Sequence, residues 1–167
     1  MSMISLGIDP GTRRIGYGVV SGEGSSVGFI AAGILDIKSS DDPGALSETK
    51  REMDAIIKKY KPDVVGVEKL YFAKNQKTAI AVAQARGVIL LAAREHRLLI
   101  REYTPNEVKL GVTGYGSADK KAVAKMVRLI LGKHDLKVID DASDALALAI
   151  LGIDKNNASL ILENNFR

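Results

Sequence analysis

Two carboxylates stand where apolar segments of the chain end. Asp9 closes an apolar run over residues 3–8 and precedes a Pro-Gly-Thr turn at 10–12, and Glu68 closes a second apolar run over 64–67. Sites in open α/β sheets form where strands end, so both side chains are placed to bind a metal ion or meet a phosphate. Each also has an ordinary interpretation. Asp9 could form an Asx turn, and Glu68 could mark where a buried strand leaves the core.

A second pair of carboxylates opens an apolar helix. Asp141 and Asp144 are three residues apart, a spacing that places both side chains on one helix face. The helix body over 145–151 is apolar nearly all round, which predicts burial and points its first acids inward. The simpler alternative is that Asp140 or Asp141 caps the helix and Asp144 interacts with its dipole.

The chemistry of these acids depends on whether they converge. Two like charges about 4 Å apart repel by roughly 4 kcal/mol at an effective dielectric near 20, so a four-acid cluster needs protons or cations. The chain has no cysteine, and its two histidines, His96 and His134, lack paired zinc-ligand spacing. Oxygen ligands favour Mg²⁺ or Mn²⁺. Two such ions can clamp the attacking and leaving oxygens of a phosphodiester.

Composition sets broader limits. The chain has 167 residues, 46% of them hydrophobic and 26% charged, which is typical of a globular protein. We expect a single domain over 1–153 and a polar, Asn-rich tail over 154–167. The net charge of +4 is compatible with nucleic acid, although many proteins without such a partner are equally basic. No signal peptide is visible, and the apolar run over 88–93 is too short to span a bilayer, so we expect a cytoplasmic protein.

Periodicity predicts a mixed α/β sheet flanked by helices. Three consecutive strands joined by short turns suggest an antiparallel meander, and strands then alternate with helices. The strands are expected at 3–9, about 15–21, about 27–37, 64–67 and 98–103. The helices are expected from 41–43 onward, over 75–95, from a capping box at 104–107, over about 118–131, and from near 141 to 151.

Several motifs, in their order and spacing, resemble the bacterial RuvC family of Holliday-junction resolvases. The resemblance covers nearly the whole chain. The matching motifs are Gly-Ile-Asp-Pro-Gly-Thr at 7–12, Val-Glu-Lys-Leu-Tyr-Phe-Ala-Lys-Asn at 67–75, Gln-Ala-Arg-Gly at 84–87, Gly-Ser-Ala-Asp-Lys at 116–120 and Asp-Ala-Ser-Asp-Ala-Leu-Ala at 141–147.

The resemblance implies an RNase H-like (retroviral-integrase-type) fold with a mixed five-stranded sheet, and a homodimer. It further implies Mg²⁺-dependent paired nicking of four-way DNA junctions in recombination and repair, leaving 5′-phosphate and 3′-hydroxyl ends. Two Mg²⁺ ions are expected per site, with Mn²⁺ as a substitute, and the branch-migration proteins RuvA and RuvB are expected partners. The implied catalytic and metal-binding acids are Asp9, Glu68, Asp141 and Asp144. Asp140 is a neighbour that could replace Asp141 as ligand.

The segment after Glu68 interleaves cations with aromatic residues. Bases exposed at a junction centre can stack on an aromatic ring, and the resemblance assigns that role to Tyr71. The alternative, a ring that packs back on the core, fits Phe72 better. Lys74 is a candidate DNA contact in the same segment.

Four further cations are candidate DNA contacts. The resemblance places Lys109 and Lys120 beside the cleavage site, where Lys120 also acts in catalysis by steadying the scissile phosphate or its developing charge. Arg13 and Arg14, in the turn after Asp9, are candidate contacts to the DNA backbone, although arginines in turns are usually just solvated.

Small apolar residues recur along the helix expected over 75–95. Core burial is their default interpretation, but they also permit close contact with a second copy of the helix across a two-fold axis. A two-fold dimer would suit a substrate with two scissile strands.

Other functions remain open at this stage. A related RNase H-like nuclease with another nucleic-acid substrate would carry the same acids, and a non-catalytic junction-binding protein would not need all four. An actin-like ATPase also begins with a strand, an aspartate and a Gly-Thr turn, but it needs two such domains and a second phosphate loop, which this chain lacks.

Overall fold

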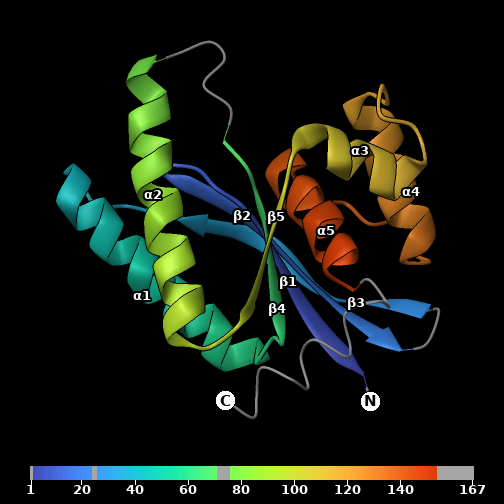
Figure 1. Ribbon diagram of the computed structural model, residues 1–167, viewed down its shortest axis with the longest axis horizontal. Helices are drawn as coiled ribbons and strands as arrows, with labels where there is room; N and C mark the ends of the chain where they lie inside the picture. Colours follow the sequence, from blue (N-terminus) through green and yellow to red (C-terminus); the bar gives the residue numbers. More distant parts are fainter. Residues whose placement is uncertain (1, 24–25, 71–75, 154–167) are drawn as a thin grey trace.

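The computed structural model describes residues 2–23, 26–70 and 76–153, and within them a single sheet is flanked by helices (Figure 1). The strands are β1 (Met3–Asp9), β2 (Arg14–Glu23), β3 (Ser26–Asp36), β4 (Val64–Glu68) and β5 (Leu99–Tyr103). The helices are α1 (Asp42–Tyr60), α2 (Gln76–Glu95), α3 (Pro105–Thr113), α4 (Lys120–Ile130) and α5 (Asp140–Gly152). Every predicted element is present, with ends shifted by a residue or two.

The sheet is mixed, as predicted. Its strand order is β3-β2-β1-β4-β5. The first three strands form the antiparallel meander, whereas β4 runs parallel to both β1 and β5. Ile8 pairs with Val67 across the parallel β1–β4 ladder. Asp9 and Glu68, one residue further along each strand, therefore end neighbouring strands at the same edge of the sheet.

Alternation along the strands decides which face each acid occupies. Leu6 and Ile8 of β1, like Val65 and Val67 of β4, are fully buried in a core cluster with residues of α1 and α2. Successive side chains of a strand point to opposite faces. Asp9 and Glu68 therefore belong to the other face, which α5 covers (Figure 1).

Glycines let α5 lie directly on the sheet backbone. A Cβ added at Gly18 would be 2.7 Å from the nitrogen of Leu146, and one at Gly66 would be 2.6 Å from the oxygen of Leu148. At Gly7 the added Cβ would overlap the main-chain oxygen of Ala145. The sheet thus presents a shallow trough without side chains, and the helix rests in it.

Local signals explain where the helices begin. The Asp41 carboxylate accepts a hydrogen bond from the Gly44 N–H at 2.7 Å and caps α1. The predicted capping box of α3 is confirmed, with Thr104 and Glu107 each bonding the main-chain N–H of the other. In the part of the chain that the structure describes, no helix has the length and apolarity to cross a membrane.

Candidate active site

Asp9 lies at the centre of a group of carboxylates. Its pKa is raised from 3.8 to about 7, first by burial and then by the negative charges of Glu68, Asp144 and Asp141, while Lys120 acts in the opposite direction. The pKa of Glu68 is also raised, by burial and by Asp144. The four acids that the sequence singled out therefore act on one another electrostatically at one edge of the sheet.

Neither Asp140 nor Asp141 caps α5, although the sequence offered both as candidates. The N-cap residue is Ile139, which makes no side-chain capping bond, and α5 begins at Asp140. Asp141 instead lies against β2, where a Cβ added at Gly16 would be 3.1 Å from the Asp141 Cβ. Asp140 is exposed, and its charge contributes to the raised pKa of Lys120 but is not among the charges that shift the pKa of Asp9. This geometry favours Asp141 over Asp140 as the acid that faces the site.

The Asx-turn interpretation of Asp9 also lacks support. Among the described residues, no hydrogen bond joins the Asp9 carboxylate to Gly11 or Thr12. The carboxylate is half-buried at the edge of the sheet, and its neighbours there are other acids. Its position is therefore not explained by local turn formation.

Lys120 is the cation of this group. Asp119 caps α4 by accepting from the Ala122 N–H, and Lys120 is the first residue of that helix. Its Nζ lies 3.3 Å from Asp144 Oδ2, and its pKa is raised by Asp144 first, with smaller contributions from Asp9 and Asp140. The Lys120 side chain is 77% exposed, so its charge also faces solvent where a phosphate would approach.

The other predicted DNA contacts differ in their relation to the acids. Arg14 is exposed, with its Nε 3.9 Å from Asp141 Oδ2. Lys109 is half-buried on α3 and is not among the charges that shift the pKa of Asp9 or Glu68. Tyr71 and Lys74 lie outside the described residues, as does the tail over 154–167.

Arg13 has a structural role. Its Nη1 donates to the main-chain oxygen of Ser39 at 2.6 Å, and its Nη2 lies 3.2 Å from Asp42 Oδ1. These contacts fasten the turn after Asp9 to the start of α1. Arg13 is thus already engaged within the chain, whereas Arg14 is the turn arginine that faces the acids.

Arg86 contributes to the site without having been singled out by sequence reasoning. From α2, its Nε donates to the main-chain oxygen of Glu68 at 2.9 Å, and its Nη2 pairs with Glu102 of β5. The side chain is only 16% exposed, and burial lowers its pKa. Two signals were available: Arg86 belongs to the Gln-Ala-Arg-Gly motif at 84–87 that matches the family, and it is an arginine within the apolar, alanine-rich stretch of α2. Its contacts show that it fixes the end of β4 from which Glu68 projects.

The donor set fits a hard divalent ion in its chemistry. It offers carboxylate oxygens from three elements, and their mutual repulsion is what an added positive charge would relieve. Within the described residues, no three His, Asp or Glu side chains are arranged as a ready-made ligand group. Binding of an ion would therefore require these carboxylates to move closer together.

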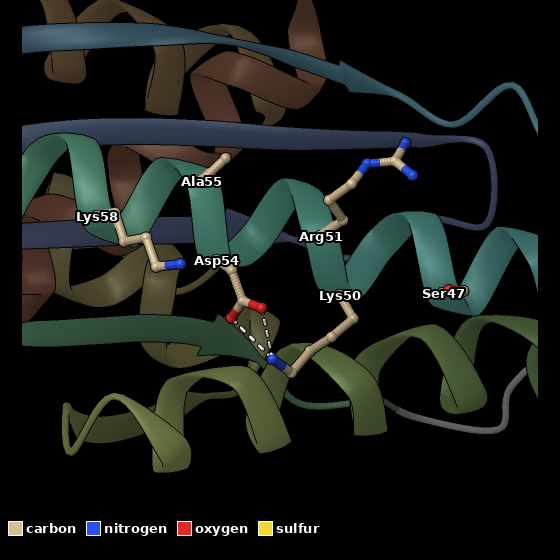
Figure 2. Close-up of a pocket in the computed structure, with 6 residues that line it drawn as sticks. All are labelled: Ser47, Lys50, Arg51, Asp54, Ala55 and Lys58. Atoms are coloured by element: carbon tan, nitrogen blue, oxygen red, sulfur yellow. Dashed lines mark hydrogen bonds and ion pairs between the residues drawn. The ribbon is translucent and has the colours of Figure 1, made fainter.

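A separate depression of about 540 Å³ lies along α1 (Figure 2). It belongs to the layer on the opposite face of the sheet from α5. Lys50 Nζ lies 2.7 Å from Asp54 and 2.8 Å from Glu95, and Asp54 also contacts His96 Nε2 at 2.9 Å. The remaining lining residues are Ser47, Arg51, Ala55 and Lys58. These paired charges join α1 to the end of α2, and the depression is distinct from the carboxylate site.

Comparison with known proteins identifies relatives along most of the chain. The family model described as crossover junction endodeoxyribonuclease RuvC matches residues 5–152. The RuvC protein of Syntrophomonas wolfei is 45% identical over 161 residues, covering 96% of this chain and 94% of its own. That of Fusobacterium nucleatum is 42% identical over 156 residues, covering 93% and 82%.

Solved structures agree with the sequence relatives. The Thermus thermophilus RuvC structure superposes with a TM-score of 0.80 at 30% identity, covering 89% of this chain and 92% of that one. The same protein in complex with a Holliday junction substrate gives a TM-score of 0.82 at 30% identity, with 89% and 91% covered. The yeast mitochondrial resolvase Ydc2, at 17% identity and a TM-score of 0.69, shares the fold. Because the family model covers residues 5–152 and the Fusobacterium nucleatum and Syntrophomonas wolfei relatives are 42% and 45% identical over most of their length, this chain, with its RNase H-like sheet, belongs to the RuvC family of crossover junction endodeoxyribonucleases.

Proposed function

We propose that this protein resolves four-way DNA junctions by hydrolysing one phosphodiester in each of two strands, leaving ligatable 5′-phosphate and 3′-hydroxyl ends. The observation that carries the proposal is the convergence of Asp9, Glu68, Asp141 and Asp144, expressed in the raised pKa of Asp9. The similar Thermus thermophilus protein is known in complex with a Holliday junction substrate, which supports a junction as the DNA substrate.

Asp9, Glu68, Asp141 and Asp144 would hold two Mg²⁺ ions, with Mn²⁺ as a substitute. When bound, such ions supply an activated water and neutralise charge on the reacting phosphate. The protein positions the ligands through its backbone. Two come from adjacent strand ends, and two come from the beginning of a helix seated on the sheet, Asp141 from its first turn and Asp144 three residues further on. Arg86 holds the Glu68 strand end in place.

Lys120 supplies a positive charge next to Asp144, as Arg14 does next to Asp141. It bonds Asp144 but remains largely exposed, so the same ammonium can contact a phosphate oxygen of a bound strand. A fixed cation beside a phosphate stabilises charge that develops during cleavage. We assign Lys120 to catalysis and Arg14 to contact with the DNA backbone. Tyr71, Lys74 and Lys109 remain proposed DNA contacts.

Paired nicks require two active sites, and α2 offers a face for a homodimer. Ala85, Ala92 and Ala93 pack into the core, so these small residues follow the default interpretation. The outward face carries Ile80 and Leu91, which are 62% and 53% exposed.

Gly87 lies between these two residues on the same exposed face, and a Cβ there would meet nothing within 4 Å. A mid-helix glycine costs up to about 1 kcal/mol relative to alanine but permits a second helix to approach closely. We propose that two copies pair through this face, and that the dimer acts with the branch-migration proteins RuvA and RuvB.

The direct test incubates the purified protein with a synthetic four-way junction and Mg²⁺. We expect paired nicks that DNA ligase can reseal, and binding without nicks for Asp9→Asn. Glu52→Gln, on the outer side of α1, removes a comparable acid away from the site and should cut like wild type. Cleavage that persists in Asp9→Asn, or ATP hydrolysis in place of nicking, would contradict the proposal.

A further inference from the structure

Tyr115 is an aromatic side chain left open to solvent in the connection between α3 and α4, five residues before Lys120. It is 65% exposed, the highest value among the exposed large hydrophobic side chains of the described residues. Tyrosine rings, which combine an apolar face with a polar end, are enriched at contact surfaces. The proposed cleavage chemistry assigns no role to this ring.

The backbone that carries Tyr115 is held in place. Gly114 ends α3 in the left-handed region with φ 75°, and its N–H donates to the Leu110 oxygen at 2.8 Å. The Tyr115 main-chain N–H donates to Thr113 Oγ1 at 3.0 Å, and the Tyr115 main-chain oxygen accepts from the Ala118 N–H at 3.1 Å. The ring therefore projects from a fixed turn, so little backbone order has to be gained when it binds a partner.

The approach to the turn is unobstructed. A Cβ added at Gly114 or Gly116 would meet no atom within 4 Å, so the backbone on either side of Tyr115 faces open space. With 65% of its surface exposed, the residue is accessible to a planar partner. A nucleobase has that shape, and every base has a π-face that can stack on an aromatic ring.

The turn is also tied to the carboxylates by a short stretch of chain. Tyr115 precedes Lys120 by five residues, which limits their Cα separation to less than about 18 Å. Lys120 bonds Asp144, and Lys121 beside it is exposed. A strand whose phosphate lies at the acids would find positive charge between that phosphate and the Tyr115 ring.

We infer that Tyr115 stacks on a nucleobase of the strand bound at the active site and thereby positions that strand for cutting. This inference rests on the proposed function and extends it, because it gives the α3–α4 turn a role in substrate contact. A stack that forms in the bound substrate and persists in the transition state contributes to binding more than to the chemical step.

The first experiment uses the absence of tryptophan from this chain. Tyr115→Trp gives the protein a single tryptophan at the turn, whose fluorescence is followed while four-way junction DNA is added without divalent ions. We expect quenching that saturates together with the gel mobility shift. Leu129→Trp, at an exposed position near the end of α4, is the matched control and should change little. An unquenched Tyr115→Trp at saturating DNA would overturn the inference.

The second experiment compares Tyr115→Ala with Tyr115→Phe in Mg²⁺-dependent nicking. We expect Ala to raise the KM for the junction about tenfold with kcat nearly unchanged, and Phe to remain within about twofold of wild type, because only Ala removes the stacking ring. Ala at wild-type KM would contradict the inference while leaving junction cutting intact. Wild type that neither binds nor nicks the junction would instead overturn the proposed function, and this inference with it.

Discussion

Gly16 is the residue against which Asp141 rests. It pairs directly with Asp9 in the antiparallel β1–β2 register, and a Cβ at Gly16 would overlap the main-chain oxygen of Asp141 and lie 3.1 Å from its Cβ. One glycine thus adjoins two of the four acids, the first through the strand ladder and the second through direct contact. The spacing between Asp9 and Asp141 depends on the absence of a side chain at this position.

Gly16→Ala should therefore impair cutting more than folding. The added methyl group must push the first turn of α5 away from the sheet, which costs about 1–3 kcal/mol of stability and moves Asp141 relative to Asp9. We expect at least a tenfold slower nicking rate, with junction binding largely retained. Gly28→Ala is the matched control, because its Cβ would meet mainly the movable Ser21 hydroxyl. Equal losses in both variants would contradict this explanation.

Asp9→Asn should stabilise the ion-free protein at high pH. The folded-state pKa of Asp9 rises from 3.8 to about 7, so the unfolded chain loses its proton first and folding stability falls as pH rises through that window. The shift corresponds to at most roughly 4 kcal/mol, and solvent screening at this half-buried edge makes about 2 kcal/mol a better expectation.

Thermal melts in EDTA at pH 4 and pH 8 measure this effect. The variant should melt several degrees above wild type at pH 8 and close to it at pH 4. Mg²⁺ should raise the melting temperature of wild type at pH 8 and have little effect on Asp9→Asn, because the ion relieves the same repulsion. A gain of equal size at both pH values would show that another cause is responsible.

Arg86→Ala should weaken both the fold and the cutting activity. It removes the hydrogen bond to the Glu68 main chain and leaves Glu102 without its cation. Glu102 is exposed and stays solvated when its cation is lost, so the main cost is the charged hydrogen bond to the Glu68 oxygen, about 1.5–3 kcal/mol. Glu102→Gln keeps the bond to Glu68 and should nick faster than Arg86→Ala. Urea unfolding and single-turnover nicking provide the two readouts.

Lys120→Ala should slow the chemical step more than it weakens binding. The ammonium lies 3.3 Å from Asp144, so its loss changes the charge at the acids themselves. We expect a drop in the single-turnover rate of a hundredfold or so, within the range found for single electrostatic groups. Lys125→Ala removes another exposed cation of α4, one with no proposed contact to DNA, and serves as the control. A purely binding defect in Lys120→Ala would reassign it to substrate positioning.

Much of this fold follows from local sequence. Short apolar runs located the strands that end at Asp9 and Glu68, and the Thr104–Glu107 capping box located the start of α3. These signals depend on residues close together in the chain. They set the elements and placed two of the acids at strand ends.

The assembly of the site depends on contacts that local patterns do not encode. Asp9 and Glu68 are adjacent because β4 inserts parallel to β1, a choice made by the whole sheet. The role of Gly16 is visible only once α5 lies across the strands. Arg86 is an arginine in an apolar helix, and only its distance to the Glu68 oxygen reveals its function.

The trough of glycines beneath α5 has a mechanical consequence. Where the helix crosses Gly18 and Gly66, its main chain lies directly against the strands, and the atoms nearest to a Cβ added at each glycine are main-chain atoms of Leu146 and Leu148. Picosecond-to-nanosecond rotamer exchange, which lets other packed interfaces yield, therefore has little effect on this contact. The start of α5 is therefore held rigidly against the strands. Asp141 and Asp144 can move relative to Asp9 and Glu68 mainly when the whole helix slides across the sheet.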